Sequence, residues 1–230
     1  MMEFIDLFLK EALIPIYAIT LIVAIYKYPK YFDSTLKYFP ILLMYTFLNE
    51  LLGYLILNDS IGNIFLTGAY SNYNYFIYNI YNIVFFIYFA LIFRTIIEDS
   101  LKKKVILYGI IFFLIISILN IIYQDPLKKS LLWSYVSGGL LMIISVILFY
   151  RNKLNKLKSF SIKKNAFFWI GLGIGLFFIG YIPIKIKYTF LTSVDSELFY
   201  KLKRIHFSLI YFMYGCFIYG FAQMKGKLKV

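Results

Sequence analysis

The sequence contains few of the residues on which metal, redox and covalent chemistry depend. Its 230 residues include one cysteine, one histidine and 11 acidic side chains. Cys216 therefore has no second cysteine with which to form an internal disulfide. His206 and a single intramembrane glutamate fall short of the three protein ligands that a catalytic zinc ion needs. We expect no metal site, no cofactor and no enzymatic activity.

Several motifs are also missing, and each absence excludes a class of protein. The chain has no P-loop, no Cys-x-x-Cys pair, no serine elbow and no paired carboxylates. No lysine lies between Phe207 and Phe217, in the middle of the last apolar stretch, where a retinal protein would form its Schiff base. The opening residues, Met1 to Asp6, lack the cationic start of a signal peptide, so we expect the first apolar stretch to remain as a permanent helix.

Apolar residues, in contrast, make up 62% of the chain, and the mean hydropathy is +0.78. They gather in seven stretches, most of them close to the roughly 20 residues that a helix needs to cross a bilayer. These stretches are 14–26, 37–57, 73–94, 104–123, 130–150, 165–182 and 202–222. Short loops leave no room for a soluble domain. The sequence predicts an all-α, polytopic membrane protein in which residues 1–230 form a single seven-helix transmembrane bundle.

The cationic residues indicate an orientation. The formal net charge is +13, and about twice as many lysine and arginine residues lie on the side of the C-terminus as on the other. Because cytoplasmic loops retain positive charge, we expect the N-terminus outside and the C-terminus in the cytoplasm. We place the protein in a bacterial inner membrane, with its basic face against anionic lipids and no nucleic-acid partner. A membrane or cytoplasmic protein partner is compatible with that face.

Glu50 is the only carboxylate well inside an apolar stretch. An ionisable group at that depth is costly, so it marks a candidate functional site and should face the interior of the bundle, as a proton-responsive group or a ligand contact. We expect a partner cation from His206 or from Lys201, Lys203 or Arg204.

The third stretch carries a polar stripe that we expect to face Glu50, because residues at spacings of three and four share one side of a helix. With Glu50, the residues Asn79, Asn82 and His206 are expected to line an outward-facing polar cavity. Possible second members are Asn49, Tyr54, Tyr75, Tyr78 and Asn120. The alternative is that these groups bond to one another and simply hold the helices together.

Four short motifs carry a resemblance to a known group of proteins. They are Asn49-Glu50, Tyr78-Asn79-x-Tyr81-Asn82, Phe168-Trp169-x-Gly171 and a polar entry to the seventh stretch. The chain resembles an uncharacterised family of small bacterial seven-helix proteins, similar to the membrane sensor modules that accompany histidine kinases. The resemblance implies a sensory or accessory role.

Three functions therefore stay open at the level of sequence. The first is a non-enzymatic sensor that binds a ligand in its outer cavity and signals through its basic inner face. The second is a small-solute or proton-coupled transporter, which would need a polar path into the inner half. The third is a structural or assembly subunit of a larger membrane complex.

Overall fold

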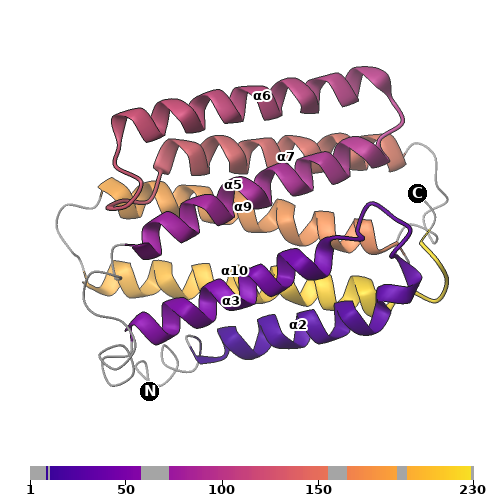
Figure 1. Cartoon of the computed structure of the whole chain (residues 1–230), viewed down its shortest axis with the longest axis horizontal. Coiled ribbons are helices and arrows are strands. Elements are labelled where there is room, and N and C mark those ends of the chain that lie inside the picture. The colour runs from indigo at the N-terminus through magenta and orange to yellow at the C-terminus, as the bar shows by residue number, and fades with distance from the viewer. Residues whose placement is uncertain (1–8, 10, 58–72, 155–164, 191–195, 229–230) are drawn as a thin grey trace.

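The computed structural model describes residues 9, 11–57, 73–154, 165–190 and 196–228 (Figure 1). Within these residues the chain is helical and contains no strand. A short 3-10 helix, η1 (Tyr28–Lys30), follows the first long helix. The long helices are α2 (Leu13–Lys27), α3 (Phe39–Leu57), α5 (Tyr73–Ile96), α6 (Ser100–Tyr123), α7 (Leu132–Leu154), α9 (Ala166–Phe190) and α10 (Ser196–Ala222).

Each predicted stretch corresponds to one of these helices. Among the described residues, six helical segments are long and apolar enough to cross a membrane, and Phe39–Leu55 of α3 is a shorter apolar segment. The prediction of an all-helical, multi-pass membrane protein is confirmed at this level.

The long helices run side by side along the longest axis of the molecule (Figure 1). Four of them, α2, α5, α7 and α10, begin at one end, which we call the N-terminal end; α3, α6 and α9 finish there. We call the other end the C-terminal end. The α9–α10 pair forms the most extensive contact, and α7 joins α9 to α6. Near the middle of this pair, a Cβ atom on Gly173 would lie 2.9 Å from the Met213 carbonyl oxygen, so glycine permits this close approach.

Two helices differ most from their predicted bounds. The sequence suggested that the sixth helix ends at Ile182 and that a loop runs from Pro183 to Lys201, but α9 continues through Pro183 to Phe190, and α10 begins at Ser196. This part of the prediction is wrong because membrane helices tolerate a proline that would end many soluble ones. Lys185, assigned to a loop, therefore lies on α9.

A capping residue accounts for the early start of α6. The Asp99 carboxylate accepts hydrogen bonds from the Leu101 amide at 2.9 Å and the Lys102 amide at 3.3 Å, which adds a turn before the predicted start at Lys104. The Lys102 ammonium lies 3.1 Å from the same carboxylate. The hydrogen bonds to Lys102 are the main reason that the pKa of Asp99 is lowered from its usual value.

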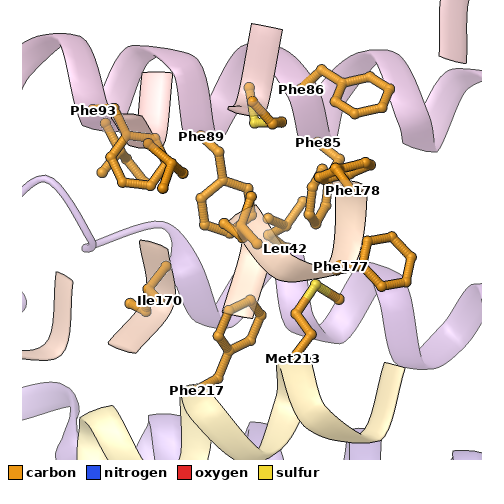
Figure 2. Close-up of a cluster of buried hydrophobic side chains, with 14 of the residues drawn as sticks. Leu42, Phe85, Phe86, Phe89, Phe93, Ile170, Phe177, Phe178, Met213 and Phe217 are labelled. Atoms are coloured by element: carbon orange, nitrogen blue, oxygen red, sulfur yellow. The ribbon is translucent and has the colours of Figure 1, made fainter. Parts of the chain in front are cut away.

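The C-terminal half of the interior is packed with aromatic rings. Phe39, Phe89, Phe217 and Phe221 are fully buried and come from α3, α5 and α10. Their ring centroids lie 5.2 to 6.3 Å apart, which is ordinary packing for tilted and edge-to-face rings. We call these four residues the aromatic cluster. Figure 2 shows two of them, Phe89 and Phe217, facing each other from α5 and α10.

Hydrogen bonds join α10 to the chain just before and just after α2. Before α2, the Leu9 carbonyl accepts a hydrogen bond at 2.6 Å from the hydroxyl of Tyr211, in the second half of α10. At the C-terminal end the Lys30 ammonium donates to the Met224 carbonyl at 2.8 Å, and the Leu228 amide donates to the Lys30 carbonyl at 2.7 Å. The segment after α10 is thereby fixed against the end of α2.

Candidate functional site

A cavity of about 370 Å³ lies in the half of the bundle near the N-terminal end. Side chains from α2, α3, α5, α7, α9 and α10 line it. Glu50 lies seven residues before the end of α3, or roughly 10 Å at about 1.5 Å per residue. The part of the cavity that Glu50 lines is therefore about that far from the end of the helix. The volume of the cavity is at the low end of the range for small-molecule sites, roughly 300 to 1,000 Å³.

One wall of the cavity surrounds the Glu50 carboxylate with tyrosines. The Tyr78 hydroxyl, on α5, donates a hydrogen bond to the carboxylate. Tyr17 on α2 and Tyr214 on α10 lie within electrostatic reach of it, and their rings meet edge to face with centroids 4.6 Å apart. Within the described chain, the side chain that bonds to Glu50 is thus a phenol and not a cation.

A chain of hydroxyl groups continues this wall along the face of α3 that carries Glu50. Thr46, four residues before Glu50, donates to the Leu42 carbonyl at 2.9 Å. Tyr81 lies 2.8 Å from the Thr46 hydroxyl and also bonds to Tyr214. Because Thr46 has already donated its proton, Tyr81 donates to it and accepts from Tyr214. Three helices are linked by these bonds.

A second wall of the cavity carries a cation. The Lys185 ammonium lies over the Tyr135 ring, 5.5 Å from its centroid, where the ring face attracts positive charge. His206 stacks on Tyr181 with ring centroids 3.8 Å apart and an interplanar angle of 14°. Tyr135 and Tyr181 meet edge to face at 5.6 Å. This wall comes from α7, α9 and α10.

Charges of opposite sign therefore line one cavity without meeting. Within the described residues, Glu50 and Lys185 form no ion pair with each other, and the side-chain amide of Asn82, which lines the same cavity, has no hydrogen-bond partner. Phe85, Phe177 and Phe178 supply an apolar surface to the same cavity. Figure 2 shows Phe85 and Phe178 next to each other, and Phe85 also packs against Phe89 of the aromatic cluster.

Five of the residues proposed from the sequence lie together in this lining. They are Glu50, Tyr75, Tyr78, Asn82 and His206. Their helical spacing placed them on inward faces, and the fold brings those faces together.

Asn79 lies outside the lining and organises the backbone between α6 and α7. Its side-chain amide donates to the carbonyls of Pro126 at 2.9 Å and Lys129 at 3.0 Å, and its oxygen accepts from the Leu131 amide at 3.1 Å. Asn79 is one residue past Tyr78, on the side of α5 that faces the α6–α7 connection. Asn79 therefore fits the alternative expectation, in which a polar side chain holds parts of the bundle together and does not line the cavity.

The other three proposed residues are also absent from the lining. Asn120 joins α6 to α7, since its oxygen accepts from the Ser134 amide at 3.1 Å. Asn49 is buried, and its side-chain nitrogen has no hydrogen-bond partner in the described part of the chain. Tyr54 is 37% exposed.

Lys185 is the charged lining residue that sequence reasoning missed. Of the residues expected to pair with Glu50, His206 lies in the lining, but the other three do not. Lys201, for example, forms an exposed ion pair with Glu197 at 2.6 Å, and Lys203 and Arg204 are not among the lining residues either. The available signal was a lysine two residues after a proline in an otherwise apolar run. Placing the helix end at Pro183 hid that signal.

The described residues contain no group of three or more histidine, cysteine, aspartate or glutamate side chains that could hold a metal ion. No protein-family model matches the chain, nor does any curated protein or solved structure. The function is therefore argued from the cavity itself.

Proposed function

We propose that this protein is a non-enzymatic membrane sensor that binds a small ligand in the cavity between Glu50 and Lys185. The observation that supports the proposal is the position of the cavity. It holds an acid, a base and an unpartnered amide, and it lies directly beside the tightly packed aromatic cluster. A ligand can enter such a site and change the packing of the helices that line it.

The helix α10 is the element best placed to carry that change. It contributes His206 and Tyr214 to the cavity and Phe217 and Phe221 to the aromatic cluster. Its contact with α9 runs along most of the bundle. A ligand shifts the equilibrium between two conformations of a protein only if it binds one of them more tightly. Here the tighter binding would come from contacts to both charged walls of the cavity.

The same proposal includes an orientation. The alternating directions of the helices put the lysine-rich segments at the C-terminal end and the cavity near the N-terminal end. The positive-inside rule supports placing the C-terminal end in the cytoplasm of a bacterium, on anionic inner-membrane lipids, with the cavity toward the outside. The four short sequence motifs, through the resemblance that they carry, are the reason to propose a protein partner at that basic face.

Transport would require a polar route from the cavity through the C-terminal half. In the described part of that half, Phe39, Phe89 and Phe217 pack against one another in the interior. The packing favours sensing over transport. An assembly subunit would use its polar residues on an outer face, whereas here they line an internal cavity.

A reporter at the far end of α9 tests the proposal without knowledge of the ligand. The chain has two tryptophans, and Trp169, in the first turn of α9, packs against Tyr219 with centroids 4.5 Å apart. In a Trp133→Phe, Cys216→Ala background, Asn82→Cys is labelled with benzyl methanethiosulfonate, which places a phenyl group in the cavity. We expect the Trp169 emission to shift and to recover when a reductant removes the label.

Tyr54→Cys in the same background is the matched control, because residue 54 is exposed on α3 and absent from the cavity lining. It should accept the label without a change in Trp169 emission. If both cysteines give the same response, or neither gives one, filling the cavity does not alter the C-terminal half and the sensor proposal fails.

A further inference from the structure

We infer that the cavity recognises a small zwitterion that bears one carboxylate, one ammonium group and an aromatic or bulky apolar side chain, the class to which aromatic α-amino acids belong. The inference rests on the proposed function, because it names the chemistry of that site's ligand. It is carried by three walls of different character around one volume: an acidic wall, a basic wall and an aromatic wall.

The acidic wall fits an ammonium group. Glu50 supplies the charge, and Tyr17 and Tyr214 present rings within its electrostatic reach. A carboxylate combined with tyrosine rings satisfies an alkylammonium by charge and by the electron-rich ring faces. Tyr78 bonds to the carboxylate through its hydroxyl, and a carboxylate has further acceptor sites beyond the one that this bond uses.

The basic wall fits a carboxylate. The Lys185 ammonium has three donors, and its contact within the described residues is the face of Tyr135, which uses its charge but accepts no conventional hydrogen bond. The unpartnered amide of Asn82 supplies further donors to the same volume. A ligand carboxylate would complete the hydrogen bonding of this wall.

A ligand with only one charge would leave the other wall uncompensated. An amine bound at Glu50 would displace water from Lys185 without giving that ammonium a partner. A simple carboxylate bound at Lys185 would likewise displace water from Glu50 and leave it without a partner. The two charges do not neutralise each other across the cavity in the described structure. Only a molecule with both signs satisfies both walls.

The size and the third wall limit the rest of the ligand. A volume of about 370 Å³ admits one molecule of amino-acid size and excludes a peptide of several residues or a whole lipid. Phe85, Phe177 and Phe178 offer ring surface to an aromatic or branched side chain. Glycine and alanine would leave this surface unfilled.

The test uses four probes that share a phenyl ring and differ in charge: phenylalanine, phenethylamine, 3-phenylpropanoate and benzyl alcohol. Affinities for the purified full-length protein in nanodiscs are measured by calorimetry or by the shift in thermal unfolding. We expect phenylalanine to bind at least about tenfold more tightly than any of the others, since each missing charge leaves a buried partner unpaired. Alanine should bind more weakly than phenylalanine.

Two substitutions assign the charges to their walls. In Lys185→Gln, the affinity for phenylalanine should fall to that for phenethylamine. The affinity for phenethylamine itself should stay unchanged. In Glu50→Gln, the affinity for phenylalanine should fall to that for 3-phenylpropanoate. Lys185→Arg keeps the charge and should keep the preference for the zwitterion, which separates recognition from a general loss of folding. Lys187→Gln, an exposed change on the same helix, is the matched control.

The outcomes separate this inference from the proposed function. Equal binding of phenylalanine and phenethylamine, or of phenylalanine and 3-phenylpropanoate, to the unmodified protein overturns the zwitterion assignment. So does an absence of binding by all four probes. The Trp169 response to a label at residue 82 is independent of these probes, so it decides the sensor proposal separately.

Discussion

The two halves of the bundle differ in how their interiors are filled. Near the C-terminal end, rings from α3, α5 and α10 pack directly against each other, and the aromatic cluster is fully buried. Near the N-terminal end, the same three helices carry Glu50, Tyr81 and His206 instead. Together with α2, α7 and α9 they line a cavity. The comparison separates a half that is closely packed from a half that holds the proposed ligand site, on the same helices.

The largest effect is expected in the aromatic cluster. Phe89→Ala removes a fully buried ring that contacts Phe39, Phe85 and Phe217. Losing such a ring and leaving a cavity costs about 3–5 kcal/mol in soluble cores, and we expect a loss of that order in the free energy of unfolding. Reversible unfolding in mixed micelles measures it.

Leu91→Ala, on the same helix, is the control. Leu91 is 43% exposed, toward the surface expected to meet lipid, so its truncation should cost much less. Equal losses of unfolding free energy for Phe89→Ala and Leu91→Ala would show that burial in the aromatic cluster adds no stability beyond that of a surface residue.

A smaller effect is expected in the cavity half. Tyr81→Phe removes the hydroxyl that links Thr46 to Tyr214, without changing the ring packing. We expect a loss of about 1 kcal/mol in the free energy of unfolding, the usual net contribution of one buried hydrogen bond. Tyr45→Phe is matched, since the Tyr45 ring meets Tyr81 edge to face and no hydroxyl bond of it appears in the described structure. A greater loss in the Tyr45 variant would contradict this account of the wall.

The smallest effect is expected at the C-terminal end, where Asp99 caps α6. Hydrogen bonds to Lys102 lower the pKa of Asp99, so its contribution is present above the pKa of the unfolded chain, near 3.9, and is lost as the pH falls through the lower folded value. The amide resonances of Leu101 and Lys102 should shift in that acidic range by NMR.

Asp99→Asn separates the cap from its charge. Asparagine caps helices about as well as aspartate but does not titrate, so the variant should keep α6 folded and lose the acid-dependent shift. A shift that persists in Asp99→Asn would come from another group.

The sequence was sufficient for the helices and for part of the site. Long apolar runs correspond to α2 through α10 because a helix satisfies all its backbone hydrogen bonds within one continuous apolar segment. Glu50, Tyr78 and Asn82 were found because an acid and amides are costly there, whatever the neighbouring helices are. These predictions needed only local physics.

The rest depended on which helices meet. Asn79 shares the polar stripe of α5 with Asn82, yet it faces the α6–α7 connection, and spacing alone does not distinguish these two directions. Helices that are apolar on every side give no stripe that marks their inner face. Lys185 was missed for a different reason: Pro183 was taken as a stop, while the surrounding helices allow α9 to continue.

Contacts along the length of α2 hold it against the second half of α10. Tyr211 donates a hydrogen bond to Leu9 just before α2, the rings of Tyr17 and Tyr214 meet beside the cavity, and Lys30 bonds to the backbone beyond Ala222. We therefore expect a tilt of α10 to be passed on to α2. Probes on the exposed side of α2, such as at Ile22, would register occupancy as readily as probes on α10 itself.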